Sequence, residues 1–164
     1  MMITDAAGIA EIHVLSWQDT YRDQMPDEML DSLDIEDRTG RWKDMLENPK
    51  GTWYGIVAVK DDKIIGWCTF GPSRDENTSE KIGEIQAIYV HPAFLGIGAG
   101  SLMMEEAKKQ LKDLHFDSAT LWVLSTNKKS RIWYEKKGWK VDGETKIDKR
   151  GDFELHETRY AINL

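Results

Sequence analysis

The stretch from 83 to 101 joins an apolar segment to a glycine-rich turn, and it contains the residue spacing that says most about chemistry. Its β-branched and aromatic residues predict a strand that ends before a proline. Gly96, Gly98 and Gly100 then stand at alternate positions, where they allow the backbone to turn its N–H groups toward one point. A helix is expected directly afterwards. Because a helix N-terminus carries unpaired N–H groups and a positive dipole end, this stretch predicts a phosphate site.

Two other phosphate-binding patterns fit this stretch less well. A P-loop needs a lysine followed by Ser or Thr after the glycines, and that pair is missing from the sequence. The dinucleotide fingerprint G-x-G-x-x-G differs at one position, because Ser101 stands where its third glycine belongs. Nucleotide binding through a modified Rossmann loop is therefore an alternative, and it predicts affinity for NADH.

A second group of polar residues, Asn127, Arg131 and Tyr134, lies at spacing i, i+4 and i+7. This spacing puts them on one stripe of a helix, which could face a ligand. The neighbouring Ile132 and Trp133 are then expected in the core. The alternative for Tyr134 is a packed tyrosine whose hydroxyl bonds to a backbone group.

Periodicity predicts the elements that position these groups. Helices are expected at 5–21, 27–33, 35–46, 98–114 and 127–137, and strands at 53–59, 64–70, 84–90, 119–124, 139–141 and 153–162. The apolar stripe of the fourth helix is expected to consist of Leu102, Met103, Ala107, Leu111 and Leu114. This order predicts an α/β (mixed α+β) protein with a mixed, mostly antiparallel sheet and helices on both faces.

Length and composition predict one domain over residues 1–164. The net charge of −7 argues against a nucleic-acid partner and suits a cationic small molecule, although ordinary proteins are often acidic too. No apolar run approaches the roughly 20 residues of a membrane span, so we expect no membrane contact and a cytoplasmic location. Cys68 is the only cysteine and the four histidines lack metal-ligand spacing, so no metal is expected. Seven tryptophans leave room for an aromatic patch at a homodimer interface.

Two segments resemble the GNAT superfamily of acyl-CoA-dependent N-acyltransferases. Tyr89-Val90-His91-Pro92, followed by the glycines, is similar to the family's coenzyme A loop, with Leu95 where the family usually has Gln or Arg. The stretch 121–127, followed by 133–139, is similar to the family's strand, Asn, and helix ending in Phe-Tyr-Glu-Lys-x-Gly-Phe. The expected order of elements also matches the GNAT fold, so the resemblance extends from about Asp5 onward.

The resemblance implies a binding mode for acetyl-CoA. The pantetheine arm would hydrogen-bond the backbone at Ile88 and Val90, while Asn127 and Arg131 would face the cofactor's other side. Tyr134 would protonate the departing thiolate. A positioned general acid typically accelerates such a reaction by about 10²–10⁴-fold. The pyrophosphate would bind the loop formed by Leu95, Gly96, Ile97, Gly98, Ala99, Gly100 and Ser101.

The acceptor amine needs a base, because an alkylammonium with a pKa of about 10.4 must lose a proton before it attacks. Glu84 is the candidate, since a carboxylate in an apolar strand is costly to bury without a purpose or a partner. A salt bridge or exposure to solvent is the alternative for this side chain. Trp17 and Tyr21, one helical turn apart, are expected to wall the acceptor pocket, with core packing as the alternative.

These features predict an N-acetyltransferase that moves an acetyl group from acetyl-CoA to a primary amine of a small molecule or peptide. The amine is expected to attack directly in a ternary complex, since Cys68 lies outside both motifs. A non-catalytic acyl-CoA-binding sensor or interaction module is the alternative.

Overall fold

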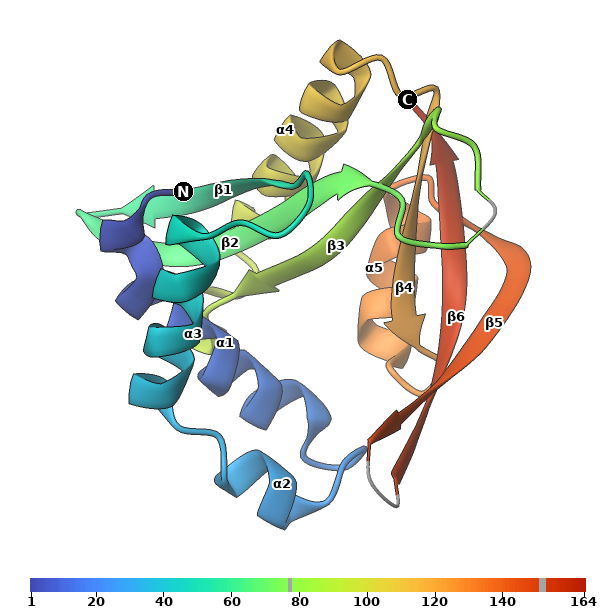
Figure 1. Cartoon of the computed structure of the whole chain (residues 1–164). Coiled ribbons are helices and arrows are strands. Elements are labelled where there is room, and N and C mark those ends of the chain that lie inside the picture. Colours follow the sequence, from blue (N-terminus) through green and yellow to red (C-terminus); the bar gives the residue numbers. More distant parts are fainter. Residues whose placement is uncertain (77, 151–152) are drawn as a thin grey trace. The chain divides into compact units, whose positions relative to one another are not determined.

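Figure 1 shows the computed structural model of the chain, which describes residues 1–76, 78–150 and 153–164. Its helices are α1 (Ala6–Tyr21), α2 (Asp27–Asp31), α3 (Ile35–Glu47), α4 (Ala99–Asp113) and α5 (Lys128–Lys136), with 3-10 turns η1 (Ile3–Asp5) and η2 (Pro92–Phe94). Its strands are β1 (Tyr54–Lys60), β2 (Lys63–Pro72), β3 (Ile82–Val90), β4 (Ser118–Leu124), β5 (Lys140–Arg150) and β6 (Phe153–Asn163).

The strands form a six-stranded sheet in the order β1-β2-β3-β4-β6-β5. β1 pairs with β2, β4 with β6, and β5 with β6 in antiparallel register, whereas β3 and β4 are parallel. The predicted α/β class and the mixed, mostly antiparallel sheet are therefore confirmed.

The described chain divides into two compact units. Unit 1 comprises Met1–Gly71 and Ala87–Ala107, and unit 2 comprises Pro72–Gln86 and Lys108–Leu164. β3 and α4 contribute residues to both units. The single domain that the sequence predicts over 1–164 stays a prediction.

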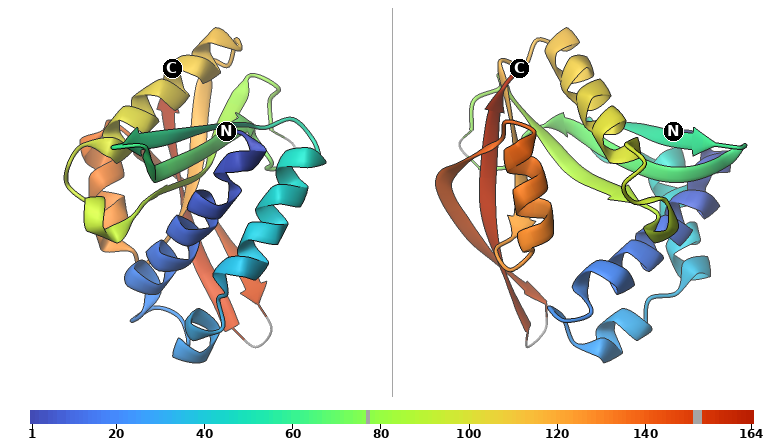
Figure 2. Two further views of the ribbon diagram at one scale, coloured as in Figure 1. Left: turned by 90° about the vertical axis from the view of Figure 1, so that its left-hand side faces the viewer. Right: turned by 180° about the vertical axis from the view of Figure 1, so that it is seen from behind.

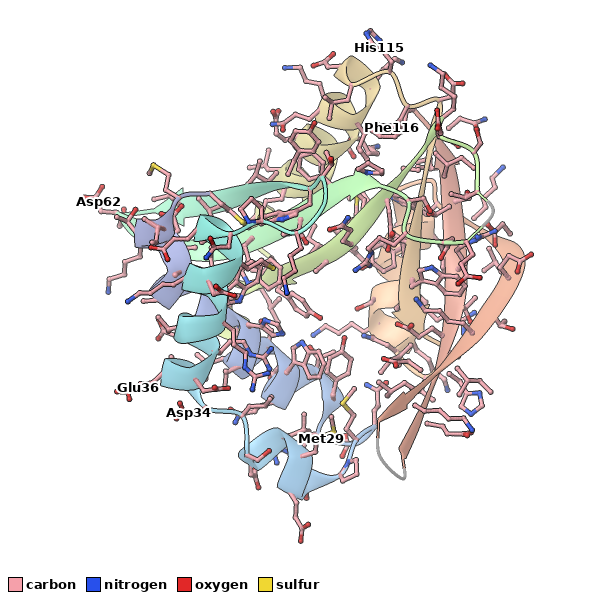
Figure 3. All side chains as sticks on the ribbon, viewed as in Figure 1. Met29, Asp34, Glu36, Asp62, His115 and Phe116 are labelled. Carbon is pink, nitrogen blue, oxygen red and sulfur yellow. The ribbon has the colours of Figure 1, made fainter. Side chains whose placement is uncertain are left out.

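In unit 1, α1 and α3 lie side by side in both views of Figure 2. α3 begins at an N-cap, since the Asp34 carboxylate accepts a hydrogen bond from the Asp37 N–H at 2.8 Å; Asp34 is labelled in Figure 3. Asp61 and Asp62 have φ angles of 49° and 60° at the turn of the β1–β2 hairpin, as a tight hairpin turn requires. The core of this unit consists of Ala6, Ile9, Ala10, Ile12, Trp42 and Trp67.

Gly66 allows α4 to approach β2 closely. A Cβ atom added there would lie 2.7 Å from Met103 Cε and 3.0 Å from the Tyr89 carbonyl oxygen. The buried face of α4 consists of Ala99, Met103, Met104, Ala107 and Leu111. The predicted stripe was wrong at Leu102 and Leu114, which are 73% and 39% exposed, because the packed face of the helix is rotated toward Met104.

In unit 2, α5 packs on β6 through Tyr134 and Tyr160, whose ring centroids are 6.2 Å apart, and the two elements lie close together in Figures 1 and 2. The prediction that Ile132 is in the core was wrong, since this side chain is 52% exposed. β5 is also longer than the predicted 139–141. Its pairing with β6 shifts register between Val141 and Thr145, where Gly143 has a φ of +98°.

Candidate functional site

The segment after β3, where the sequence predicts an anion site, lies in unit 1. His91 is the N-cap of η2, and its Nδ1 accepts a hydrogen bond from the Ala93 N–H at 3.1 Å. Gly96 and Gly98 then have φ angles of +81° and +95°, which disfavour other residues. α4 begins at Ala99, and the Leu102 N–H donates to the Gly98 carbonyl at 3.0 Å. The N–H groups at the start of the helix therefore precede its first internal hydrogen bond and can bind an anion.

The side chains of this loop add no charge to the anion site. Leu95 and Ile97 are 45% and 54% exposed. A Cβ atom at Gly96 or Gly98 would have no atom within 4 Å, so the positive φ alone limits substitution in the described structure. The loop therefore offers backbone N–H groups and an exposed apolar surface.

The backbone edge predicted at Ile88 and Val90 belongs to the last part of β3. The register of β3 with β4 runs from Ile82↔Ser118 to Glu84↔Thr120 and ends there. The Val90 carbonyl accepts a hydrogen bond from the buried Ser16 hydroxyl at 3.1 Å, a contact that ties β3 to α1. Because a carbonyl oxygen has two lone pairs, Val90 keeps acceptor capacity.

Trp17 and Tyr21 belong to an aromatic cluster in unit 1. Their ring centroids are 5.3 Å apart, and Trp17 Nε1 donates to the Tyr89 hydroxyl at 3.0 Å. His13 stacks on Tyr89 with ring centroids 5.6 Å apart, and it lies 5.5 Å from Trp67. The cluster holds Trp17 in a fixed orientation, so this side chain combines core packing with partial exposure.

His13 is neutral at physiological pH. Burial, with the nearby positive charge of Arg38 as the smaller cause, lowers the pKa of its imidazole to about 4. The Nδ1 atom is buried and has no hydrogen-bond partner in the part of the chain that the structure describes. Protonation would therefore place an unpaired charge among aromatic rings.

Stability is expected to depend on pH through His13. The unfolded imidazole titrates near pH 6.5 and the folded one near 4, so the stabilisation is present above pH 6.5 and is lost as the pH falls toward 4. The free energy of unfolding falls by up to about 3–4 kcal/mol through this group. Urea unfolding at pH 7, 5.5 and 4.5 should show a smaller loss in His13→Phe, which keeps an aromatic ring.

The exposed His115 provides the control, since its φ of +67° is tolerated by asparagine. His115→Asn should lose as much stability as the wild type between pH 7 and 4.5. An equal loss in His13→Phe would contradict the role of His13.

The second predicted group lies in unit 2 on α5. Asn127 is the buried N-cap of this helix, and its side-chain oxygen accepts a hydrogen bond from the Ser130 N–H at 3.1 Å. Arg131 donates from Nε to the Tyr160 hydroxyl at 3.1 Å and from Nη1 to the Ser125 carbonyl at 2.9 Å. Tyr134 is only 9% exposed and packs among Trp133, Trp139 and Tyr160.

A shallow hollow of about 150 Å³ lies on the same helix, lined by Lys128, Arg131, Ile132 and Glu135. Two of its four lining residues are basic, Glu135 is acidic, and Ile132 gives it an apolar wall. The contacts of Arg131 with Tyr160 and Ser125 fix its guanidinium beside this hollow.

Glu84 is buried in unit 2, at 1% exposure, and pairs with Arg74. Its Oε2 accepts hydrogen bonds from the backbone N–H and the Nε of Arg74, at 2.9 and 3.0 Å, and its Oε1 accepts from Nη2. Sequence reasoning included a salt bridge for Glu84 but did not find Arg74, whose only signal is a basic residue just after the end of β2.

Cys68 is buried, and desolvation raises the pKa of its thiol to about 12. A thiol with this pKa is not a nucleophile at neutral pH, since the thiolate is the reactive form.

No helix among the described residues is long and apolar enough to cross a membrane. Within the same residues, no three His, Cys, Asp or Glu side chains are grouped to hold a metal ion.

The model of the acetyltransferase (GNAT) family matches residues 8–139. YuaI of Bacillus subtilis, an uncharacterized N-acetyltransferase, is 30% identical over 135 residues, covering 81% of this chain and 73% of that protein. The structure of the paiA N-acetyltransferase from Thermoplasma acidophilum in complex with coenzyme A has a TM-score of 0.74 at 20% identity. The match covers 100% of this chain and 96% of that one. The structure of yncA from Salmonella typhimurium, with its cofactor acetyl-CoA, has a TM-score of 0.70 at 18% identity, and the match covers 99% of this chain and 90% of that one.

The fold is that of the two solved structures named above. The family match covers most of the chain, and the protein belongs to the acetyltransferase (GNAT) family. It is therefore an acyltransferase that uses acetyl-CoA as cosubstrate.

The predicted site residues fall into two sets. Unit 1 contains Trp17, Tyr21, Ile88, Val90 and the loop 95–101, and unit 2 contains Glu84, Asn127, Arg131 and Tyr134. Their roles stay predictions.

Proposed function

We propose that this GNAT family member transfers the acetyl group of acetyl-CoA to a primary amine of a small molecule or peptide, by direct attack in a ternary complex. The observation that carries the proposal is the loop 95–101, where two glycines at positive φ lead into the N-terminus of α4. A pyrophosphate there would accept hydrogen bonds from backbone N–H groups and interact with the positive end of the helix dipole.

The rest of the cofactor is proposed to use backbone and basic groups. The pantetheine arm hydrogen-bonds to the backbone groups of Ile88 and Val90. These two residues follow the last residues of β3 that pair with β4. Asn127 and Arg131 contact the cofactor from α5. The support for Arg131 is its guanidinium, which lines the hollow on α5 and is held by two hydrogen bonds.

Proton transfers at Glu84 and Tyr134 complete the proposed chemistry. Glu84 accepts a proton from the ammonium of the acceptor, and the amine nitrogen then attacks the thioester carbonyl. The Tyr134 hydroxyl donates a proton to the CoA sulfur as the C–S bond breaks. The nitrogen loses its second proton as the amide forms; that proton restores Tyr134 through solvent, and Glu84 releases its own proton to solvent. No enzyme thiol takes part, because the buried Cys68 is protonated at neutral pH.

The acceptor is proposed to bind beside Trp17 and Tyr21, in the aromatic cluster on α1. A net charge of −7 favours a cationic amine at long range. A polyamine, an aminoglycoside, an amino acid and a peptide N-terminus all fit this chemistry. The cytoplasmic location and the homodimer are also proposals.

Calorimetric titration with acetyl-CoA tests the loop. Wild type should bind acetyl-CoA and leave NADH unbound, and Gly98→Ala should weaken acetyl-CoA binding by about tenfold or more. The reason is the φ of +95°, since an alanine forced into such a conformation costs about 1–3 kcal/mol. Thiol release with spermidine, kanamycin, lysine and an N-terminal alanine peptide then tests acceptor turnover.

Gly143→Ala is the matched control. Gly143 has nearly the same φ, +98°, and an added Cβ would also have no atom within 4 Å, but it lies on β5. This variant should lose similar stability and bind acetyl-CoA as wild type does. Equal weakening in both variants, or binding of NADH alone, would refute the proposed cofactor loop.

A further inference from the structure

Glu84 and Arg74 form an asymmetric ion pair in unit 2. The Glu84 side chain is 2% exposed, whereas that of Arg74 is 60% exposed. Arg74 follows the end of β2, and the Ser73 N–H bonds the Ile82 carbonyl at 3.0 Å, so the chain before Arg74 is tied to the start of β3. The guanidinium that pairs with the buried Glu84 carboxylate therefore comes from a residue whose backbone is itself held next to β3.

Three hydrogen bonds from one residue fix this carboxylate. Oε2 accepts from the backbone N–H and from Nε of Arg74, and Oε1 accepts from Nη2 at 2.5 Å. A carboxylate offers about four acceptor positions. Among the described residues, the position left over is on Oε1.

The other charges near Arg74 have partners of their own. Asp75 pairs with Arg159 at 2.8 Å, and Glu157 pairs with Lys146 at 3.3 Å. The pKa of the Arg74 guanidinium is raised, first by its hydrogen bonds with Glu84 and further by the charges of Glu84, Asp75 and Glu157, against a lowering by burial. Thr120 of β4, opposite Glu84 in the sheet, is uncharged. Arg74 is thus the cation that compensates Glu84.

We propose that Arg74 is a positioning residue for the reaction, which fixes the orientation of the Glu84 carboxylate and leaves one acceptor position of Oε1 for a proton of the acceptor ammonium. This inference rests on the proposed role of Glu84 as the base. In that step one proton moves from the ammonium nitrogen to Oε1, and no other bond changes. In general, a buried carboxyl group that lacks a neighbouring cation favours its neutral acid form, which cannot accept a proton.

The test is the pH profile of kcat/KM, measured by thiol release with whichever of the four amines above has the highest turnover. In Arg74→Met, which removes the charge and keeps an apolar stem, the acid limb should move up by about one pH unit. Arg74→Lys should keep the acid limb of the wild type but lower the maximum kcat/KM by about three- to tenfold. An ammonium group cannot reproduce the two parallel hydrogen bonds that the guanidinium donates to Glu84. An acid limb that stays in place in a folded Arg74→Met overturns the proposal.

Thermal melting shows whether each variant is folded. If Arg74→Met does not fold, Arg74→Lys decides, since a maximum kcat/KM equal to that of the wild type would overturn the proposal. Glu84→Gln separates this inference from the function on which it rests. A wild-type kcat in Glu84→Gln refutes the base itself, whereas a lowered kcat with an unmoved limb in Arg74→Met refutes only the role of Arg74.

Discussion

Tyr134→Phe is expected to lower kcat for acetyl transfer by about 10²-fold, and by up to about 10⁴-fold if proton donation to the thiolate limits the rate. The substitution removes one oxygen atom and leaves the ring among Trp133, Trp139 and Tyr160. Acetyl-CoA binding, measured by calorimetry, should change by less than about threefold, because the hydroxyl acts on the leaving group in the transition state. Steady-state thiol release measures kcat.

Tyr160→Phe is the matched control for this effect. Tyr160 is a neighbouring, fully buried tyrosine whose hydroxyl donates to Glu135 at 2.8 Å and accepts from Arg131. Its loss should cost about 1–2 kcal/mol of stability. It also removes one of the two hydrogen bonds that hold Arg131, so acetyl-CoA binding is expected to weaken, but kcat at saturating acetyl-CoA should change little. If both variants lower kcat equally, or if Tyr134→Phe keeps the wild-type rate, Tyr134 is a packing residue and not the acid.

Glu84→Gln is expected to lower kcat by about 10²-fold, because an amide cannot take the proton of the attacking ammonium. The side chain keeps its size and its strand position. Stability should fall by about 1–3 kcal/mol, since a charge-assisted hydrogen-bond pair is weakened, and the largely exposed Arg74 can regain water. Measuring kcat at rising pH gives a second signature. A variant without its base should regain rate as a larger fraction of the amine becomes neutral in solution.

Asp142→Asn separates the loss of an ion pair from the loss of the base. Asp142 accepts a hydrogen bond from Arg159 Nε at 2.8 Å and is 24% exposed, so its substitution also breaks an Arg–carboxylate pair in unit 2. Its kcat should stay near that of the wild type. A comparable fall in kcat in Asp142→Asn would mean that damage to unit 2, and not the missing base, explains Glu84→Gln.

The segment around the glycine loop could be predicted because its chemistry is local. A proline ends β3, and Gly96 and Gly98 adopt φ angles that glycine tolerates best. The N-terminus of α4 then follows from the change in periodicity. Each of these properties depends on residues a few positions apart, so the sequence alone was sufficient.

β5 and the buried face of α4 were predicted less well, because neighbouring elements decide them. Residues 142–150 are mostly charged and lack the composition of a strand, but they pair with β6 along most of their length. Backbone hydrogen bonds to an existing strand can therefore impose the extended conformation against local preference. On α4, Met104 is buried and Leu102 is exposed because packing against the sheet sets the rotation of the helix.

The sequence by itself determined the family, the glycine loop and the identity of the candidate acid and base, because motif spacing and residue chemistry are local properties. Only the tertiary structure showed that Glu84 is buried against Arg74, ten residues away and just after the end of β2. It also showed that His13 is neutral within an aromatic cluster from α1, α3, β2 and β3. Burial and ion pairing depend on which distant segments meet, and that is decided by the packing of the whole fold.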